Sequence, residues 1–418
     1  MTLIDRINTP GCGCDDAVTH LMTVSDAVEA GLALADPIEE IETVPLQQAR
    51  GRILAAPILA RADMPRFDNS GMDGYALCLD ELPQTQVLPV QGESAAGAPT
   101  PTLERGTMMR IFTGAPVPIG ADTVVMQEHV SRDGKFARIT KIPAKGSNIR
   151  RAGEDQKTGD VLLDAGVVLE PKHIAICAGA GQGHIPVLRK LRVGVILTGD
   201  ELCAAGDGLT DGAIWDVNTP MLLALLDDIH ADLVAVEHVP DTKSRLLTAT
   251  VEMSWKVDVI ITSGGVSVGD RDHVKPMLQS LGAHVAVSGV AIKPGKPITV
   301  SKLANSVVIS LPGNPVSAFV TWQVLGRPIA AKIAGQTQNM QPRRHVHARG
   351  GVQHKTGRCE YRPASIVGYD PRGLEVVACP PQTRSANLSP LTNADGLILI
   401  PGNIEHVPEG DLLEFLPF

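Results

Sequence analysis

The chain of 418 residues carries Lys+Arg 37 against Asp+Glu 46, which gives a formal net charge of −9, and it is 44% hydrophobic and 20% charged. These values are those of a globular protein and exclude a disordered or collagen-like chain, and the length allows about three domains of roughly 150 residues. The acidic balance argues against a general nucleic-acid-binding protein, because neutralising phosphates requires a basic surface. No apolar run reaches the roughly 20 residues of a membrane span, and the first residues lack the apolar segment of a signal peptide. We therefore expect a soluble, cytoplasmic protein without nucleic-acid or membrane partners.

The seven cysteines are odd in number and scattered along the chain, so we expect no disulfide framework. Only Cys12 and Cys14 form a cluster, followed by two aspartates. This pair could be half of a soft-metal or redox site, but no second pair exists to complete four ligands. We interpret residues 1–22 as a flexible N-terminal arm.

The N-terminal region begins with a helical pattern over residues 23–35, for which Thr23 or Ser25 would be the N-cap. Between residues 83 and 125, prolines and glycines interrupt short apolar runs. Such spacing predicts short strands joined by turns. We expect residues 23–188 to form a linker and a β-rich domain of irregular α+β character.

The centre of the chain, residues 189–335, alternates near-continuous Val/Ile strands with helices. The expected strands are 192–198, 232–239, 257–262 and 306–311, and the expected helices are 219–229, 243–254, 272–281 and 315–334. Two helix starts carry cap signals, Thr219 before Pro220 and Asn314 before Pro315. This alternation predicts a parallel, doubly wound α/β sheet. Ligands of such sheets bind outside the carboxyl ends of the strands.

The tail, residues 342–418, shows alternating apolar residues in three segments, at 374–377, 396–400 and 411–415. This pattern predicts a small all-β barrel. The predicted fold is therefore multidomain α/β, with an irregular α+β N-terminal region, a central doubly wound α/β domain and a small C-terminal β-barrel.

Four polar loops fall at the predicted strand ends of the central sheet. They are LTGDEL (197–202), SGGVSVGDRD (263–272), KPGKP (293–297) and LPGNPVS (311–317). Glycine-rich loops at helix N-termini turn backbone N–H groups toward an anion, and lysines add charge for phosphate. Carboxylates beside an anion require a hard cation between them, and oxygen ligands suit Mg²⁺. The four loops together predict a phosphate–Mg²⁺ site with phosphoryl or nucleotidyl chemistry.

Each loop also has a simpler interpretation. The GG pair could be a tight strand-to-helix turn, Asp200 and Glu201 could cap a helix, and KPGKP could be an exposed loop. Their location at one sheet edge favours a shared site. In the N-terminal region, FDNSGMDGYA (67–76), IFTGAP (111–116) and NIRRAGED (148–155) are polar loops without helical or strand period. The residue pattern indicates an anion and metal site but names no substrate.

At these residues the chain resembles the molybdopterin molybdotransferase family, which comprises MoeA-type proteins and the corresponding domain of gephyrin. The matching motifs, in family order from about residue 23 to the C-terminus, are FDNSGMDGYA, IFTGAPVPIGADTVVMQE, NIRRAGED, LTGDEL, TSGGVSVGDRD, IKPGKP and LPGNPVSA. The combination is highly specific, although GGVSVG and PGNP alone also occur in the related adenylyltransferase domain and in competence-damage-type proteins.

This resemblance implies a role in molybdenum cofactor biosynthesis, in which molybdate is inserted into adenylylated molybdopterin with Mg²⁺-dependent release of AMP. It also implies a homodimer in which the N-terminal region of one subunit faces the α/β domain of the other. Molybdopterin adenylyltransferase and downstream molybdoenzyme maturation proteins are the further partners that it suggests.

The resemblance also implies roles for residues of this chain. The metal ligands would be Glu201, Asp241 and Asp272, with Asp200 in the same acidic set. Lys293 and Lys296 would hold phosphate or molybdate, and Arg362 and Ser385 would hold molybdate. The implied catalytic residues are Asp73, Asp155, Glu201, Asp241, Asp272, Lys293 and Lys296, of which Asp73 and Asp155, together with Thr113 and Arg150, would come from the partner subunit. The remaining implied substrate-binding residues are Ser263, Gly264, Gly265, Ser267, Pro312, Gly313, Asn314, Pro315 and Ser317.

The chain departs from the family pattern at two positions. Gly289 stands where many relatives carry a basic residue, four positions before the first lysine of KPGKP, so one anion contact would be missing or supplied from elsewhere. Asp270 replaces the usual glutamate after GGVSVG and keeps its charge. The pair Cys12 and Cys14 lies outside the family core.

Two alternative functions stay open from the sequence. An adenylyltransferase that makes the activated pterin would need only the central domain, and the presence of the flanking domains argues against it. A non-catalytic, pterin-binding scaffold is disfavoured by the intact acids and lysines. Tungstate is an alternative oxyanion, and service to a single molybdoenzyme is an alternative role.

Overall fold

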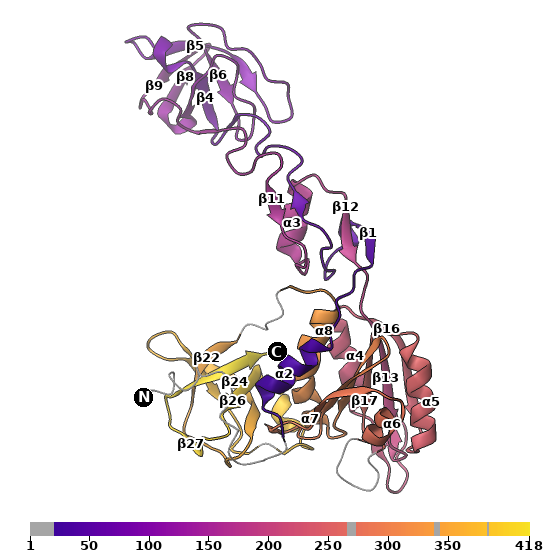
Figure 1. Ribbon diagram of the computed structural model, residues 1–418. Helices are drawn as coiled ribbons and strands as arrows, with labels where there is room; N and C mark the ends of the chain where they lie inside the picture. The colour runs from indigo at the N-terminus through magenta and orange to yellow at the C-terminus, as the bar shows by residue number, and fades with distance from the viewer. Residues whose placement is uncertain (1–20, 266–272, 338–342, 383) are drawn as a thin grey trace.

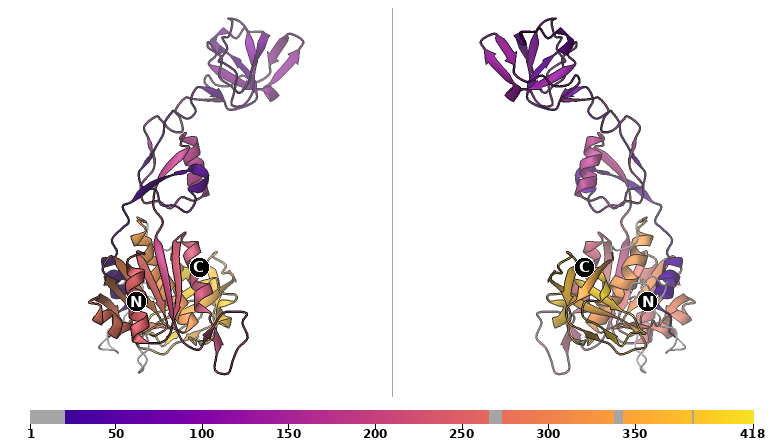
Figure 2. Two further views of the ribbon diagram at one scale, coloured as in Figure 1. Left: turned by 90° about the vertical axis from the view of Figure 1, so that its right-hand side faces the viewer. Right: turned by 90° about the vertical axis from the view of Figure 1, so that its left-hand side faces the viewer.

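The computed structural model describes residues 21–265, 273–337, 343–382 and 384–418, which form an elongated molecule (Figure 1). A distal β domain, a small middle module and a broad base follow one another along the long axis, and both side views show the same arrangement (Figure 2). The base contains the central α/β domain and the C-terminal barrel side by side. The described part of the chain starts at the base, runs out to the distal domain and returns to the base.

The first helix of the described chain, α2 (Val24–Ala33), belongs to the base. The Thr23 hydroxyl accepts the backbone N–H of Asp26 at 3.1 Å, which confirms the predicted helix and the first of its two candidate caps. At the other end, Lys332 Nζ donates to the Leu32 carbonyl at 2.8 Å. A cation at a helix C-terminus is favourable, so this contact fixes α2 to the central domain.

The central sheet has the strand order β16-β13-β17-β21-β20-β18. Its strands are β13 (Arg192–Thr198), β16 (Asp232–Val239), β17 (Val259–Ser263), β18 (His284–Ser288), β20 (Thr299–Leu303) and β21 (Ser306–Leu311). The first four strands in the order are parallel, as predicted, and they correspond to the four predicted strands.

The other two strands make the sheet mixed, which the sequence prediction missed. Strand β20 runs antiparallel to β21, and β18 runs antiparallel to β20. The reason is the connection between β20 and β21, where Leu303 pairs with Ser306 across the two residues Ala304 and Asn305. A connection of two residues can join only antiparallel strands.

Helices cover both faces of this sheet. They are α4 (Asn218–Asp228), α5 (Lys243–Ser254), α6 (Val274–Ser280), α7 (Pro315–Thr321) and α8 (Arg327–Ile333), with the π-helical turn η4 (Trp322–Gly326) between the last two. Buried side chains of α5 and α6 form one core with the sheet, and those of α2, α4, α7 and α8 form the other. The doubly wound arrangement is therefore confirmed, and Trp322 is buried in the second core.

The start of α4 differs from its prediction. The helix begins at Asn218, and Asp216 Oδ1 accepts the backbone N–H of Thr219 at 3.0 Å. Asp216 thus satisfies a free N–H of the first turn, a role that the sequence prediction gave to Thr219 itself.

The C-terminal barrel is closed, as predicted. Its five strands are β22 (Arg344–Ala348), β24 (Cys359–Tyr369), β25 (Glu375–Ala378), β26 (Gly396–Ile400) and β28 (Leu412–Pro417), accompanied by the short elements β23 (Val352–Gln353), η5 (Ser389–Leu391) and β27 (His406–Val407). The order β24-β25-β22-β28-β26 returns to β24, since β26 also pairs with β24. Strand β19 (Ile292–Lys293) of the central domain pairs in parallel with β24. The barrel is therefore hydrogen-bonded to the KPGKP segment.

The rest of the N-terminal region forms two modules with separate hydrophobic cores. The middle module contains β1 (Ile41–Pro45), η1 (Leu46–Gln48), β2 (Ile58–Leu59), β11 (Val161–Leu163), α3 (Pro171–Gly179) and β12 (His184–Leu188). The distal domain contains β3 (Asn69–Ser70), β4 (Gly74–Leu77), η2 (Leu79–Glu81), β5 (Val87–Ser94), β6 (Met108–Ile111), β7 (Thr123–Met126), η3 (Gln127–His129), β8 (Val130–Asp133), β9 (Phe136–Ile139) and β10 (Ile149–Arg150). The β-rich character is as predicted, but α2 packs apart from both modules, in the base. Within the described ranges, no helix has the length and apolar character needed to cross a membrane.

Substitution of Trp322 tests how much the buried core of the central domain contributes to stability. Its side chain is fully buried, whereas Trp255, after α5, is 82% exposed. We expect Trp322→Ala to lower the free energy of unfolding by about 3–5 kcal/mol through cavity formation. The matched change Trp255→Ala should alter it by no more than about 0.5 kcal/mol. Urea unfolding followed by near-ultraviolet circular dichroism measures both, and equal effects would contradict this description of the core.

Candidate functional site

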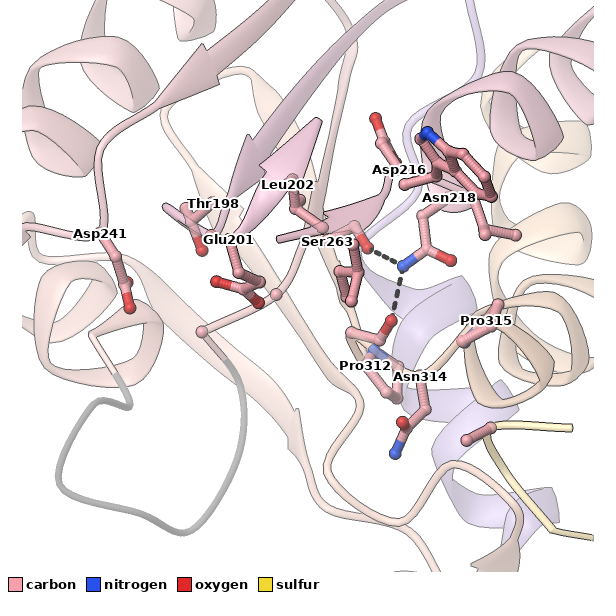
Figure 3. Close-up of a pocket in the computed structure, with 18 of the residues that line it drawn as sticks. Thr198, Glu201, Leu202, Asp216, Asn218, Asp241, Ser263, Pro312, Asn314 and Pro315 are labelled. Carbon is pink, nitrogen blue, oxygen red and sulfur yellow. Dashed lines mark hydrogen bonds between the residues drawn. The ribbon is translucent and has the colours of Figure 1, made fainter. Parts of the chain in front are cut away.

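A cavity of about 580 Å³ lies at the carboxyl-end edge of the central sheet (Figure 3). Its lining includes Thr198 at the end of β13, Ser263 at the end of β17 and Pro312 directly after β21. Predicted site residues in the lining are Glu201, Asp241, Ser263, Gly264, Gly265, Pro312, Gly313, Asn314 and Pro315. The structure therefore brings residues of all four predicted loops to one cavity, three of them after parallel strands that end at one edge and the fourth through Pro297.

The loop after β17 passes very close to the end of β13. Gly264 has φ +95°, and a Cβ there would lie 2.6 Å from the Thr198 carbonyl oxygen. Only glycine adopts this conformation without strain and permits this approach. The double glycine is thus more than a turn signal, because it lets two cavity-lining loops approach each other.

The Asn218 amide joins the start of α4 to two of these loops. Its Nδ2 donates to Ser263 Oγ at 2.8 Å and to the Gly313 carbonyl at 2.7 Å, as the dashed lines in Figure 3 show. The side chain is buried, at 8% exposure, and it lines the cavity. The sequence analysis missed Asn218. The one feature that could have indicated it is its position directly before the Thr-Pro helix start, where a polar side chain is expected.

Two carboxylates lie across Ser263 from Asn218 in the same view, those of Glu201 and Asp241 (Figure 3). Neither is ion-paired to a basic residue of the described chain. Asp216 also lines the cavity, but its carboxylate accepts both the backbone N–H and the hydroxyl of Thr219. The cavity therefore has two carboxylates that are available for a cation.

These two carboxylates fit a magnesium site. Within the described ranges no cluster of three or more His, Cys, Asp or Glu side chains could hold a metal ion. Mg²⁺, however, commonly uses only one or two protein carboxylates and completes its shell with waters and substrate phosphate oxygens. The third predicted ligand, Asp272, lies outside the described residues, as do Ser267 and Asp270.

Asp200 has a different position from the other acids. Its carboxylate accepts the backbone N–H of Asp241 at 3.3 Å, and it is absent from the cavity lining. Asp200 therefore supports the loop that carries Asp241. Its membership of the substrate-binding set, which the family resemblance implies, stays a prediction.

The predicted residues of the N-terminal region lie in or beside the distal domain, far from the cavity of their own chain (Figure 1). Asp73 accepts the backbone N–H of Thr113 at 2.7 Å and its hydroxyl at 3.0 Å, and these two hydrogen bonds lower the pKa of Asp73. Arg150 lies on β10, which pairs with β3, and the Asp155 N–H donates to the Met64 carbonyl at 3.0 Å. The four residues group at one end of the molecule but do not meet the cavity within one chain.

The KPGKP loop reaches the rim of the cavity through Pro297. Lys296 is exposed, and Lys293 Nζ lies 2.9 Å from Glu360 Oε2 on the barrel. Neither lysine is part of the cavity lining. Gly289 has φ +88°, a conformation that disfavours any side chain, so a basic residue there would strain this backbone.

The barrel also contributes to the cavity, which the sequence analysis foresaw only for Ser385. Ala386 and Leu388 are part of the lining. The Ser385 carbonyl accepts the backbone N–H of Val316 at 3.2 Å, at the start of α7, while the Ser317 side chain is buried in that helix. The segment around Ser385 therefore lies against the PGNP loop.

Arg362 is enclosed by the protein, and its predicted contact with molybdate stays a prediction. The residue is 1% exposed, and its Nε donates to Glu360 Oε1 at 3.0 Å. Its other two nitrogens donate to the carbonyls of Pro380, Pro381 and Gln353 at 3.0–3.2 Å. Alternate residues of a strand share one face, so on β24 Arg362 points with Glu360 into the protein interior.

The fold and the cavity define a class of α/β protein whose ligand site lies where the loops after parallel strands meet. Comparison with known families agrees. Residues 22–181 match the MoeA N-terminal region (domain I and II), residues 194–332 match a probable molybdopterin binding domain, and residues 346–418 match the MoeA C-terminal region (domain IV).

Individual relatives extend this likeness over most of the chain. A molybdopterin molybdenumtransferase of Haemophilus influenzae is 41% identical over 72% of this chain and 75% of its own length. Molybdopterin molybdenumtransferase 2 of Mycobacterium tuberculosis is 36% identical over 89% of this chain and 94% of its own length. The crystal structure of a molybdopterin biosynthesis MoeA protein from Pyrococcus horikoshii OT3 superimposes with a TM-score of 0.81 at 27% identity, covering 95% of this chain and 100% of that one. The chain belongs to the MoeA family of molybdopterin molybdenumtransferases.

Gly264 and Gly282 form a matched pair for testing the loop geometry. Both have positive φ, but only at Gly264 would a Cβ meet another group within 4 Å. Alanine at either position should cost roughly 1–2 kcal/mol for the left-handed backbone. Gly264→Ala should lower the free energy of unfolding by roughly 1–3 kcal/mol more, because the Thr198 carbonyl must move. Denaturant titration of both variants measures the difference, and equal losses would show that the close approach is unimportant.

Proposed function

We propose that this chain is a molybdopterin molybdotransferase, which inserts molybdate into adenylylated molybdopterin and releases AMP in a Mg²⁺-dependent reaction. The observation that carries the proposal is the placement of the Glu201 and Asp241 carboxylates in a cavity otherwise built from glycine-rich loops and a helix start. Relatives named molybdopterin molybdenumtransferase match the chain over most of its length, which supports the proposal. This reaction belongs to molybdenum cofactor biosynthesis, and its cytoplasmic location is part of the proposal.

Magnesium is the cation that this donor set suits. Glu201 and Asp241 would hold it, with Asp272 as a third ligand from the loop after β17. When bound, Mg²⁺ supplies positive charge to the oxygens of the phosphoanhydride as the bond to AMP breaks.

The chain itself would bind and orient the remaining groups. Backbone N–H groups of the loops at Gly264 and Gly313 can donate to phosphate oxygens, and such fixed donors stabilise charge that develops during bond cleavage. Lys293 and Lys296 would attract molybdate to the rim of the cavity. Holding the oxyanion beside the pterin while AMP departs would couple metal insertion to cleavage through position alone.

We also propose that the working form is a homodimer. Asp73, Thr113, Arg150 and Asp155 group around the distal domain, far from the cavity of their own chain (Figure 1). An elongated chain that carries site residues at both ends can complete two equivalent sites when two copies associate about a twofold axis. The distal residues would then contact the ligand in the cavity of the partner subunit.

The carboxylates provide the first test. We expect Glu201→Gln and Asp241→Asn each to reduce kcat for AMP release by at least about 100-fold, because each removes charge that holds the cation. Incubation with adenylylated molybdopterin, Mg²⁺ and molybdate measures AMP and metal-loaded cofactor together. Glu252→Gln, on the exposed side of α5, is the control and should leave turnover unchanged. Turnover within twofold of the native rate in both cavity variants would refute the proposal, and ATP consumption with pyrophosphate release would favour an adenylyltransferase.

Mixed dimers provide the second test. Coexpression of Asp73→Ala with Asp241→Asn should give heterodimers with one intact site, and so about a quarter of the native activity if the subunits assort randomly. Each variant alone should be inactive. The control pair Asp73→Ala with Arg150→Ala should restore nothing, since both changes affect the distal end. Absence of restoration in the first pair would exclude a shared site.

A further inference from the structure

The barrel holds a buried carboxylate against the KPGKP loop. In the pairing of β19 with β24, Lys293 lies opposite Glu360. The Glu360 side chain is fully buried, and its Oε2 accepts a hydrogen bond from Lys293 Nζ at 2.9 Å. This ion pair spans the boundary between the central domain and the barrel, and none of the roles discussed so far uses Glu360.

The Glu360 carboxylate has a fixed position. Its second oxygen, Oε1, accepts from Arg362 Nε at 3.0 Å, and the rest of the Arg362 guanidinium is hydrogen-bonded to backbone carbonyls. Burial raises the pKa of Glu360, but the hydrogen bonds and charges of Arg362 and Lys293 outweigh it, and the pKa lies below its ordinary value. Glu360 is therefore an anion held from the barrel side.

Two other titratable groups lie near this cluster, His354 and Cys379. Burial raises the pKa of the Cys379 thiol, which keeps it neutral, so Lys293 is the adjustable member of the cluster. The His354 ring is buried, and its Nδ1 lies 2.7 Å from the Ile404 carbonyl, which requires a proton on that nitrogen. Its Nε2 is 3.8 Å from Glu360 Oε2, beyond hydrogen-bond distance. The Lys293 side chain is 30% exposed, so its ammonium both contacts Glu360 and faces solvent.

The cluster of Lys293, Glu360 and Arg362 has a net positive charge, which attracts an anion. Lys293 and Arg362 are positive and Glu360 is negative, which sums to +1. Because Arg362 is enclosed, the accessible positive charge is that of Lys293. One of its three N–H donors is used by Glu360, and the ammonium can offer others to an incoming oxyanion.

We propose that Glu360 is a positioning residue, which holds the Lys293 ammonium in place so that it can bind the oxyanion substrate. This inference rests on the proposed function, in which Lys293 attracts molybdate. It assigns Arg362 the role of holding Glu360, and it gives the barrel a part in the reaction without contact between Glu360 and substrate.

Replacing Glu360 by an uncharged residue distinguishes two roles for it, positioning of Lys293 and simple repulsion of the oxyanion. If Glu360 acted only as a nearby negative charge, Glu360→Gln would make the region more positive and molybdate would bind more tightly. If Glu360 positions Lys293, the same change releases the ammonium and molybdate binds more weakly. The two roles predict opposite signs.

The experiment measures KM for molybdate, KM for adenylylated molybdopterin and kcat. We expect Glu360→Gln and Glu360→Asp to raise KM for molybdate roughly 10-fold, the loss of one charge-assisted contact. The aspartate keeps the charge but is one methylene too short to maintain both contacts. The values of kcat and of KM for the pterin substrate should stay within about twofold. An unchanged or lowered KM for molybdate in both variants would overturn the proposal.

Three control variants distinguish an error in the positioning role of Glu360 from an error in the proposed function of Lys293. Glu375→Gln breaks a more exposed ion pair of the barrel, with Arg344 at 2.8 Å, and should leave KM for molybdate unchanged. Lys293→Ala should raise KM for molybdate, and in that background Glu360→Asp should add nothing, because its effect passes through Lys293. If Lys293→Ala has no effect, the proposed function of the lysine is wrong. If it has an effect but Glu360→Asp adds to it fully, only the positioning role is wrong.

A further variant tests the proposal even if the Glu360 variants fail to fold, which removal of a partner from buried Arg362 could cause. Lys293→Arg keeps the positive charge but replaces the compact ammonium, 2.9 Å from Glu360, by a larger planar guanidinium that must take a different position. Positioning predicts a raised KM for molybdate in this variant, whereas a requirement for charge alone predicts no change.

Discussion

The carboxyl ends of β13, β17 and β21 meet at one edge of the central sheet, and the rest of the candidate site depends on this constraint. Parallel strands bring together loops that are far apart in the chain. The bonds from Asn218 to Ser263 and Gly313 connect three of these segments. These two bonds therefore hold the start of α4 against the loop after β17 and the PGNP loop.

The barrel completes this edge in two physically different ways. It supplies apolar lining through Ala386 and Leu388, which narrows the cavity. It also supplies a buried negative charge at Glu360, which would be costly to bury without the two cations that contact it. A barrel that merely covered the domain would not need a buried charge at the boundary. The cost is consistent with selection for the position of Lys293.

The elongated shape keeps the residues proposed for the site apart within one chain. The distal domain and the base have separate cores joined by the middle module, so the two ends cannot fold back onto each other without rearranging that module. In the proposed homodimer, association of two copies would bring Asp73 and Arg150 to the cavity of the partner subunit. The low pKa of Asp73 keeps its carboxylate ionised, which suits a role beside a cation or a hydrogen-bond donor.

The sequence by itself determined the elements whose signals are local. Continuous Val/Ile runs marked the parallel strands, alternation marked the barrel, Thr23 marked the first helix, and glycine-rich loops marked the cavity. These features depend on the period and caps of single segments. Only the tertiary structure decided which distant residues meet. The antiparallel partner β20, the tie made by Asn218 and the pairing of Lys293 with Glu360, 67 residues away, arise from contacts between segments. Arg362 shows the same limit, because its role depends on which face of β24 it occupies, and closure of the barrel fixes that face.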